Sequence, residues 1–445
     1  MLSSRVRNDR SQERVESVIE DLSHEARGVA HHEGKAVFIE DALPGERVEW
    51  LRSKRGKTFD EGKLDRLIEA SPDRVTPKCA HYGVCGGCAL QHLDPLKQIE
   101  FKQRQLMEAL TRIGHVAPDE WLPSLQADAW NYRRRARMAA KWVAKKQRVM
   151  VGFRERATPY ITDIQRCEVL SEPVDSLILP LSEMLTGLSI RDRVPQVEVA
   201  VAENAVALVV RVLLPLTDAD IARIREFGSK YQVQMYLQPG GYETIAPLDG
   251  NAVELTYSLP EFDVELAFLP ADFVQINGEL NRRMVGKALE LLNPTAEEDV
   301  LDLFCGLGNF SLPLARRARH VVGVEGEAGL VARARANAVR NNIANAEFFT
   351  TNLMDDKPLR DAWTTRRYDK VLIDPPRAGA KEVLPLIAAS GASRLVYISC
   401  HTGSFARDAG ILVNDHGFKL RSAGVMDMFP HTTHVESMAV FTRER

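Results

Sequence analysis

The sequence predicts an α/β protein of three domains, in which the last domain is a doubly wound, mostly parallel β-sheet. From residue 278 onward, short apolar strands alternate with helical stretches, which is typical of a parallel sheet with helices on both faces. Residues 14–70 contain short strands separated by glycine and proline turns, which predicts a small closed β-barrel. Residues 128–270 are again rich in strands, so a β-rich domain is expected in between.

The overall composition is that of a globular protein with enough apolar material for several cores. The chain has 445 residues, of which 45% are hydrophobic and 27% are charged. It has no run of 18 apolar residues, and its polar first ten residues lack the apolar segment of a secretory signal. We therefore expect a cytoplasmic protein without a membrane partner. The net charge of -3 gives no global sign of nucleic-acid binding, so such binding would depend on a local patch.

The first predicted domain covers residues 12–71. Apolar Val37 and Ile39 lie two residues apart, as in a strand with one buried face, and Pro44-Gly45 is a turn signal. Three basic residues fall on one predicted loop: Lys54, Arg55 and Lys57.

The second predicted domain covers residues 72–270 and begins with a cysteine-rich loop. A helix over 93–114 follows, and its apolar face is expected to pack on the third domain. Two hairpins are predicted, one from strands at 197–201 and 206–212, the other from strands at 255–259 and 264–268.

Four cysteines of this second domain have a spacing that suits a metal site. Cys79-x5-Cys85-x2-Cys88 lies on a glycine-rich loop, and Cys167 follows 79 residues after Cys88. Clustered cysteines in a cytosolic protein are more often metal ligands or nucleophiles than disulfides. Four thiolates suit either a [4Fe–4S] cluster or tetrahedral zinc, and the spacing alone does not separate the two.

A run of arginines follows the cysteine loop. Four of the five residues from 133 to 137 are arginines, and Trp130 and Trp142 flank the run. Such a pattern fits phosphate contacts and base stacking on RNA. The alternative is a solvated strand face held by salt bridges.

The third predicted domain covers residues 271–445. Strands are expected at 300–304, 320–325, 346–351, 369–374 and 394–399, with helices at 328–341 and 404–415.

The first of these strands runs into a glycine turn that suits a bound ligand. Gly306 and Gly308 let the backbone approach it closely, and Glu325, at the end of the second strand, is placed to bind ribose hydroxyls. Asn352 and Asp374 end the third and fourth strands. Ser311 stands where a nucleotide oxidoreductase would carry its third glycine, so the spacing instead resembles that of S-adenosylmethionine methyltransferases. The alternative is an ordinary βα turn.

Candidate catalytic residues lie at the ends of the later strands. Arg377 follows Pro375-Pro376, where methyltransferases that modify amino groups have an aromatic residue, so amino methylation is disfavoured. Cys400 ends the fifth strand at the edge where a nucleophile reaches a substrate. A thiolate that adds to carbon 6 of uracil makes carbon 5 nucleophilic, and Glu436 is the candidate base for the carbon-5 proton. The alternatives are a small buried Cys400 and a solvated Glu436.

Together, four motifs resemble the RNA uracil-C5-methyltransferase family: Asp272-Phe273-Val-Gln275-Ile-Asn277, Asp374-Pro-Pro-Arg-Ala-Gly379, Tyr397-Ile-Ser-Cys400 and His434-Val-Glu436-Ser437. The resemblance implies a class I (Rossmann-like) S-adenosylmethionine methyltransferase domain, with Cys400 as the nucleophile and Glu436 as the base. It also implies that six residues line the cofactor and catalytic pocket: Gln275, Phe304, Asn309, Glu325, Asn352 and Asp374.

Two further features resemble one branch of this family, the bacterial 23S ribosomal RNA uracil methyltransferases. Gly28-Val-Ala and Leu43-Pro-Gly45-Glu46 look like a TRAM domain, a small RNA-binding barrel. The cysteine spacing matches the iron–sulfur site of this branch, which implies a [4Fe–4S] cluster on Cys79, Cys85, Cys88 and Cys167. The implied activity is C5-methylation of one uridine in 23S rRNA. A radical S-adenosylmethionine enzyme uses C-x3-C-x2-C and leaves one iron of its cluster open, whereas Cys167 is available to fill that position here. A structural or RNA-positioning cluster is therefore expected, with a redox role as the alternative.

One departure from the family pattern is visible, because His401-Thr402 follows Cys400 where such enzymes often have Asn-Pro. This change puts only the loop geometry in doubt. The alternative hypotheses are a tRNA uracil-C5-methyltransferase and a non-catalytic RNA-binding iron–sulfur protein. We expect a monomer.

Overall fold

The computed structural model describes residues 14–355 and 361–444. Residues 12, 13 and 445, at the ends of the predicted domains, lie outside this range. The chain divides into two compact units: unit 1 contains residues up to 98 together with 431–433, and unit 2 contains residues 99–430 and 434 onward. Among the described residues, none of the helices has the length and apolar character needed to span a bilayer.

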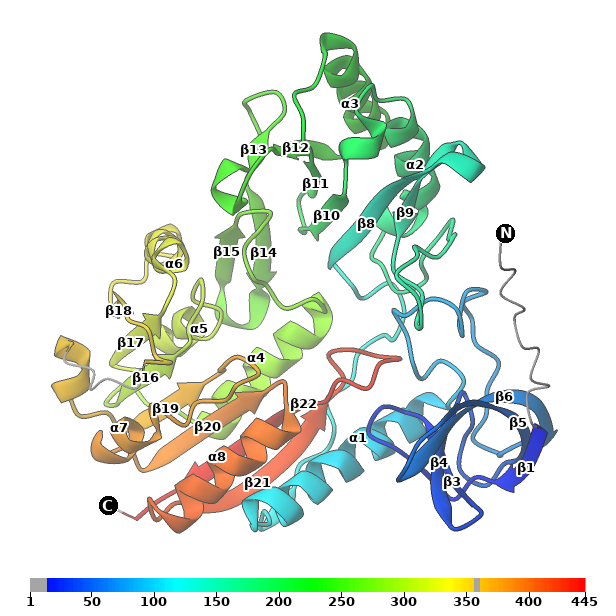
Figure 1. Cartoon of the computed structure of the whole chain (residues 1–445). Helices are drawn as coiled ribbons and strands as arrows, with labels where there is room; N and C mark the ends of the chain where they lie inside the picture. The colour runs from blue at the N-terminus through cyan, green and yellow to red at the C-terminus, as the bar shows by residue number, and fades with distance from the viewer. Residues whose placement is uncertain (1–13, 356–360, 445) are drawn as a thin grey trace, which may run out of the picture. The chain divides into compact units, whose positions relative to one another are not determined.

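Unit 1 contains a six-stranded sheet with the order β1-β5-β6-β4-β3-β2 (Figure 1). Its strands are β1 (Arg14–Val18), β2 (Asp21–Leu22), β3 (Gly28–His32), β4 (Lys35–Glu40), β5 (Arg47–Arg55) and β6 (Phe59–Glu69). Only two residues separate β1 from β2, yet these strands lie at opposite ends of the order. The sheet therefore closes on itself, which confirms the predicted barrel.

The barrel core is centred on Trp50, which is fully buried. The indole N–H of Trp50 donates a hydrogen bond of 3.0 Å to the Ser17 hydroxyl. Gly62 lies against this ring, because a Cβ atom at that position would come within 2.5 Å of Trp50 Cε3. The closely packed core thus requires a residue without a side chain on β6.

The C-terminal part of unit 2 is an eight-stranded sheet with the order β18-β17-β16-β19-β20-β22-β21-β7. Its strands are β16 (Asp299–Leu303), β17 (His320–Glu325), β18 (Ala346–Thr350), β19 (Lys370–Ile373), β20 (Arg394–Ser399), β21 (Lys419–Met426), β22 (Glu436–Thr442) and β7 (Glu120–Trp121). The strands from β18 to β20 are parallel, and β22 is antiparallel to both of its neighbours. This mostly parallel sheet was predicted.

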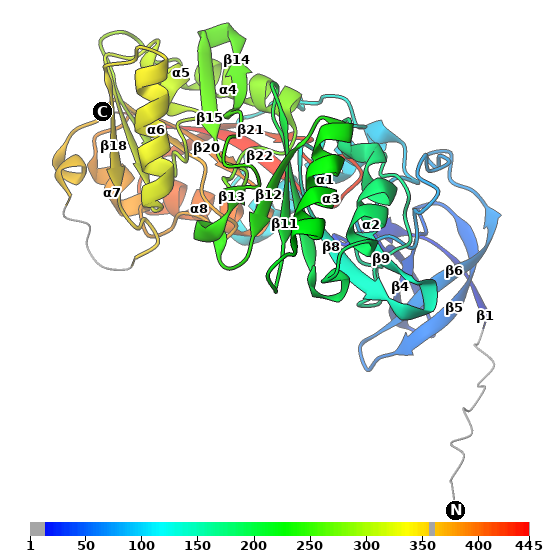
Figure 2. The same cartoon turned by 90° about the horizontal axis from the view of Figure 1, so that it is seen from above.

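Helices cover both faces of this sheet, so the doubly wound arrangement is confirmed. On β20, Val396 and Ile398 pack in the cluster that contains α4 (Gly278–Leu292), α5 (Ser311–Ala315) and α6 (Ala328–Arg340). The alternate residues Leu395 and Tyr397 pack in a second cluster with residues of α1 (Pro95–Ala109), η1 (Leu110–Gly114), α7 (Leu384–Ala389) and α8 (Thr402–Asn414). Figure 2 shows α6 alongside the edge strand β18.

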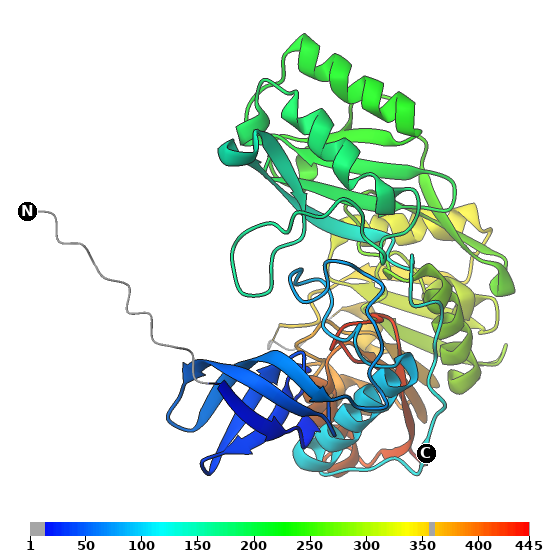
Figure 3. The ribbon, with the colours of Figure 1, turned by 90° about the vertical axis from the view of Figure 1, so that its right-hand side faces the viewer.

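The central part of unit 2 is a second six-stranded sheet with the order β13-β12-β11-β10-β8-β9. Its strands are β8 (Arg135–Val143), β9 (Arg148–Gly152), β10 (Gln196–Val201), β11 (Val206–Arg211), β12 (Gln234–Gln238) and β13 (Ala246–Pro247). The helices α2 (Ile178–Thr186) and α3 (Asp218–Tyr231) pack on one face of this sheet (Figure 3). The 3-10 helices are η2 (Ala144–Lys146), η3 (Val174–Ser176), η4 (Arg191–Arg193), η5 (Tyr242–Thr244), η6 (Pro260–Phe262) and η7 (Ala362–Thr365).

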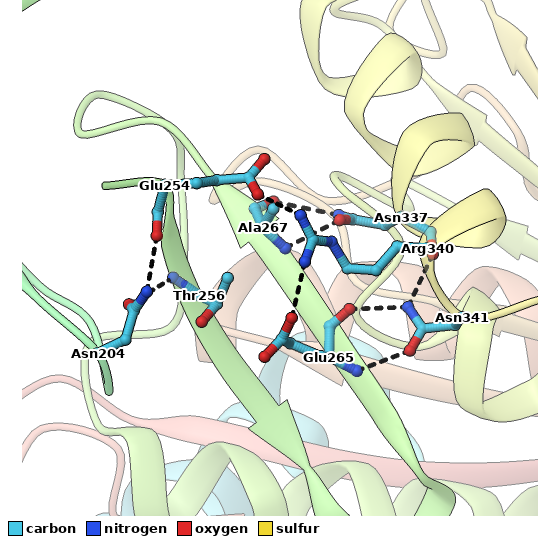
Figure 4. Close-up of polar contacts among 8 residues, drawn as sticks. All are labelled: Asn204, Glu254, Thr256, Glu265, Ala267, Asn337, Arg340 and Asn341. Atoms are coloured by element: carbon cyan, nitrogen blue, oxygen red, sulfur yellow. Dashed lines mark hydrogen bonds and ion pairs between the residues drawn. The ribbon is translucent and has the colours of Figure 1, made fainter. Parts of the chain in front are cut away.

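The hairpin of β14 (Leu255–Leu259) and β15 (Val264–Phe268) joins the core of the C-terminal sheet. The side-chain amide of Asn337 on α6 accepts a bond from Ala267 N (2.8 Å) and donates one to Ala267 O (3.1 Å) (Figure 4). Asn341, one helical turn later, bonds in the same way to the backbone of Glu265. The boundary predicted at residue 270 therefore does not coincide with a break in packing, and the division into three domains stays a prediction.

Candidate active site

A cavity of about 620 Å³ opens at the carboxyl ends of the parallel strands, where open α/β sheets bind ligands. Its walls come from the segments that follow β15, β16, β17, β18, β19 and β20, together with the segment before β22. The structure brings all eight predicted catalytic and cofactor residues to this cavity: Gln275, Phe304, Asn309, Glu325, Asn352, Asp374, Cys400 and Glu436.

The turn after β16 has an unusual backbone. Phe304 has a φ of 62°, and Gly306 and Gly308 have φ values of 55° and 97°. A bulky residue such as Phe304 rarely adopts the left-handed region, and such strain collects at ligand sites. A Cβ at Gly308 would also lie 3.1 Å from Leu312 Cγ. The turn thus depends on glycine to bring its backbone against the cavity.

Glu325, at the end of β17, is fixed by backbone donors. Its carboxylate accepts hydrogen bonds from Gly306 N at 3.1 Å and from Gly326 N at 2.7 Å. These bonds join the end of β17 to the turn after β16. They hold the carboxylate at the position where an acidic residue binds ribose hydroxyls.

Asn309 is held by two residues that the sequence did not single out. Its side-chain amide exchanges two 3.0 Å hydrogen bonds with Asn281 of α4, and its oxygen also accepts a 2.9 Å bond from the Tyr257 hydroxyl. Tyr257 lies on β14, about 50 residues earlier in the chain. No local pattern marks either residue, because both contacts form only when the hairpin and α4 pack beside the turn.

Two carboxyl groups with raised pKa values lie at or behind the cavity, Asp374 partly buried and Asp302 fully buried. Burial raises the pKa of Asp374 to about 7, and Gln275 Nε2 donates a 3.4 Å hydrogen bond to its Oδ2. Burial likewise raises the pKa of Asp302, on β16, to about 8, although Ser311 hydrogen-bonds it. A carboxyl group that titrates near neutrality either donates or accepts a proton at little cost.

Cys400 and Glu436 lie side by side because their strands are neighbours. Ser399 on β20 pairs with Ser437 on β22, so the residues just beyond this pair are at the same edge of the sheet. Burial, followed by the nearby carboxyl groups of Glu436 and Asp374, raises the pKa of the Cys400 thiol to about 12. Burial and Asp374 also raise the pKa of Glu436 well above its usual range.

Two cations oppose the upward pKa shifts of Cys400 and Glu436. The Arg377 guanidinium lowers the pKa of both Cys400 and Glu436, and Lys102 lowers that of Glu436. The site therefore contains three acidic groups that cannot all ionise without a cation nearby. An arrangement of this kind suits covalent catalysis assisted by a general base.

Comparison with known proteins agrees with this geometry. The family model described as tRNA (Uracil-5-)-methyltransferase matches residues 97–444. The chain belongs to this family. A TRAM domain model matches residues 13–49, within the barrel.

Curated relatives of the chain match it over its whole length. It is 51% identical to "23S rRNA (uracil(1939)-C(5))-methyltransferase RlmD" of Stenotrophomonas maltophilia strain K279a, with 100% of both chains covered. It is 48% identical to the protein of the same name in Xanthomonas campestris pv. campestris strain 8004, again with both chains fully covered. Among solved structures, it resembles Pyrococcus abyssi tRNA (uracil-54, C5)-methyltransferase in complex with S-adenosyl-L-homocysteine, with 25% identity and a TM-score of 0.72. That match covers 96% of this chain and 100% of the other.

His401, the departure from the family pattern, caps the helix that follows the catalytic cysteine candidate. Its Nδ1 accepts a 3.2 Å hydrogen bond from Ser404 N at the start of α8. The Ser404 hydroxyl in turn donates to Arg377 O at 2.8 Å. An asparagine side chain is a strongly preferred cap at this position. His401 therefore retains the capping role, and the loops after β19 and β20 stay joined.

The arginine run serves the protein interior in part. Arg134 is buried, its Nε donates to Gln275 O at 3.0 Å, and its guanidinium lies 4.8 Å from the centre of the Tyr257 ring. Arg135 donates to Asp272 O. The prediction of an RNA-contacting side chain is wrong for Arg134, because this side chain is buried and holds the segment that carries Gln275. For Arg135, which is partly buried, it stays a prediction.

The cysteines of the predicted cluster are distributed over both units. Cys79, Cys85 and Cys88 belong to unit 1 and Cys167 to unit 2, and all four are partly buried. Gly87 lies beside Cys85, because a Cβ at that position would lie at van der Waals distance, 3.6 Å, from its Sγ. Across the described ranges, no group of three or more Cys, His, Asp or Glu residues is arranged to hold a metal ion.

Proposed function

We propose that this protein methylates carbon 5 of a uridine in 23S ribosomal RNA with S-adenosylmethionine as the methyl donor. The relatives that carry this activity in their names match the full chain at 48–51% identity. The observation that carries the chemistry is the convergence of Cys400 and Glu436, from adjacent strands, on one cavity.

The proposed reaction begins at carbon 6 of the flipped uracil. The Cys400 thiolate adds to carbon 6, which makes carbon 5 an enolate-like nucleophile that takes the methyl group. S-adenosylmethionine, when bound, supplies that methyl group on a positively charged sulfur. Glu436 then removes the carbon-5 proton, the carbon 5–carbon 6 double bond re-forms, and the Cys400 sulfur leaves.

One cation and one helix terminus oppose the raised pKa of the Cys400 thiol. Arg377 is the charged group that lowers the pKa of Cys400. The helix α8 begins at Thr402, two residues after Cys400, so its N-terminus lies near the sulfur in the sequence. Both features favour an anionic sulfur. Asp374, whose pKa is about 7, is suited to exchange a proton with the uracil edge.

The cofactor is proposed to occupy the part of the cavity near the turn after β16. Glu325 would bind the ribose hydroxyls, and Phe304 supplies apolar surface. Gln275, Asn309 and Asn352 present amide groups from three different segments of the wall. Glu325 and the amides fit the polar parts of this ligand.

The test is a trapping experiment with RNA that contains 5-fluorouridine. Fluorine at carbon 5 cannot leave as a proton, so the covalent enzyme–RNA adduct accumulates and is visible on a denaturing gel. We expect an adduct with a 23S fragment that is absent with Cys400→Ala. An adduct with tRNA alone would support the tRNA methyltransferase alternative, and labelled methyl transfer without any adduct would refute the covalent mechanism. If neither appears on any RNA, a non-catalytic RNA-binding protein is the better explanation.

We further propose that Cys79, Cys85, Cys88 and Cys167 bind a [4Fe–4S] cluster. The support for this is their number and spacing in the sequence. Iron and acid-labile sulfide analysis of anaerobically purified protein tests it, with Cys167→Ser as the matched variant. Bound zinc without sulfide would favour the alternative structural site.

The remaining parts of the proposal concern the organisation of the chain. The barrel at 12–71 would bind RNA, the region 72–270 would carry the cluster, and 271–445 would carry the reaction. The protein is proposed to act as a cytoplasmic monomer, which sedimentation analysis checks for the oligomeric state.

A further inference from the structure

Lys102, on α1, is a fully buried lysine with a fixed ammonium group. Its side chain is 0% exposed. The Nζ atom donates a 2.6 Å hydrogen bond to Asp427 Oδ1 and a 2.9 Å bond to Phe429 O. A buried ammonium is expensive unless it is paired and hydrogen-bonded, so this lysine is held in one place by both partners.

The two partners of Lys102 belong to the segment between β21 and β22 that forms one wall of the cavity. Met426, directly before Asp427, pairs with Glu436 across the two strands. Phe429 lines the cavity, and its ring centre lies 5.2 Å from that of His434, which lines it as well. The segment starts after Met426, the partner of Glu436, and ends directly before Glu436 itself. Lys102 therefore fixes a cavity wall that is next to Glu436 at both of its ends.

Five groups interact with Glu436 from the surrounding elements or line the cavity beside it. Asp374 and Arg377 come from the loop after β19, Cys400 follows β20, His434 precedes β22, and Lys102 comes from α1. Only Arg377 and Lys102 lower the pKa of Glu436.

These two cations differ in their surroundings. Arg377 is exposed and lies on the loop that also faces Cys400, whereas Lys102 is enclosed. A charge in a buried site interacts more strongly with its neighbours than a solvated one. Burial lowers the pKa of Lys102, whereas the carboxylate of Asp427, 2.6 Å from Nζ, raises it. The bonds from Nζ to Asp427 and Phe429 O favour the charged ammonium, so Lys102 is the enclosed cation that acts on Glu436.

We propose that Lys102 is a positioning residue for proton abstraction: through Asp427 and Phe429 it holds the β21–β22 segment and keeps a buried positive charge beside Glu436, so that Glu436 is ionised when the carbon-5 proton must be removed. This inference rests on the proposed function. In the step concerned, a Glu436 oxygen takes the carbon-5 proton, the electrons of that bond form the carbon 5–carbon 6 double bond, and the carbon 6–sulfur bond breaks to return the thiolate. Lys102 touches none of the reacting atoms.

The test uses the full-length protein and RNA whose uridines carry tritium in place of hydrogen at carbon 5. Release of tritium to water then reports removal of the carbon-5 proton. In Lys102→Met, we expect tritium release at pH 7 to slow about tenfold, with the acidic limb of its pH profile moved up by about one pH unit. The methylated adduct should accumulate on a denaturing gel to a higher level than in the wild type. Arg112→Met is the matched control, because it removes an exposed cation that follows the same helix, and we expect an unchanged profile.

A second variant guards against misfolding, because Lys102→Met leaves Asp427 buried without its cation. Lys102→Met/Asp427→Asn removes both charges together, which is tolerated better than removal of one partner. We expect the acidic limb of the double variant to move up as well, but by less than in Lys102→Met, because the Asp427 carboxylate is removed together with the ammonium. A profile that superimposes on that of the wild type in the double variant overturns the proposal, as does slow release without any change in pH dependence.

Trapping with 5-fluorouridine RNA distinguishes a failure of the role proposed for Lys102 from a failure of the proposed function. That adduct does not depend on proton removal, so the double variant should form it at the wild-type rate. If the wild type itself forms no adduct, the covalent mechanism fails, and the role of Lys102 fails with it.

Discussion

Replacement of His401 by alanine tests how the loop after Cys400 is held. The change removes the Nδ1 acceptor of the 3.2 Å bond from Ser404 N, which caps α8. Loss of such a cap lowers the free energy of unfolding by about 1 kcal/mol. In a domain of this size, that corresponds to a melting temperature lower by about 2 °C. His401→Asn is the matched control, because an asparagine oxygen can accept the same bond.

The cap should also depend on pH. Burial, followed by the charges of Arg377 and Arg407, lowers the pKa of His401, and a protonated Nδ1 cannot accept a hydrogen bond. Because the folded pKa lies below that of the unfolded chain, the contribution is complete above the ordinary histidine value of about 6.5. It is lost as the pH falls through the folded value. The asparagine variant has no group that titrates there.

The assay is thermal unfolding, followed by circular dichroism between pH 5 and pH 8, of the wild type and both variants. We expect His401→Ala to melt below the wild type at pH 8, and the difference to shrink towards pH 5. His401→Asn should remain close to the wild type at pH 8 and lose less stability in acid. Equal melting of the wild type and His401→Ala at pH 8, or equal acid sensitivity of the wild type and His401→Asn, would refute the reasoning.

Three further changes test the cavity and its support. Glu325→Gln should weaken S-adenosylmethionine binding about tenfold by calorimetry, because a charged acceptor for the ribose is lost; unchanged affinity would remove Glu325 from the cofactor site. Asp408→Ala should lower the free energy of unfolding, measured in urea, by about 3 kcal/mol. The reason is that the buried Asp408 carboxylate accepts 2.7 Å bonds from the Tyr397 hydroxyl and from Ala380 N. A loss below about 1 kcal/mol would contradict this. Gly308→Ala should cost about 2 kcal/mol, since φ is 97° and the new Cβ meets Leu312; a stability equal to the wild type would show that the turn tolerates a side chain.

The fold was largely predictable because the signals that specify it are local. The expected strands at 300–304, 320–325 and 394–399 agree with β16, β17 and β20 to within one residue at each end. Alternation of strands and helices predicts a parallel sheet, and the carboxyl ends of parallel strands meet at one edge. The same rule explains why Glu325, Asp374 and Cys400 were expected near each other before any packing was known.

Packing between distant segments was not predictable. RNA contact was expected for the arginine run that contains Arg134, but the Arg134 side chain is buried where Gln275 O and the Tyr257 ring come together. A charge run has the same sequence pattern whether it faces water or a neighbouring segment, so only the tertiary contacts decide between them. The helix at 93–114 was expected to pack on the third domain, yet nothing in it marked Lys102 as a neighbour of the catalytic cavity.

By itself, the sequence determined the doubly wound sheet, the barrel and the residues at the strand ends, because hydrophobic period and turn chemistry act over a few residues. The tertiary structure alone decided that β22 lies between β20 and β21, which places Glu436 beside Cys400. It also decided that Lys102 pairs with Asp427 across 325 residues. Such contacts depend on burial and charge in a folded interior, and no local pattern in the chain encodes them.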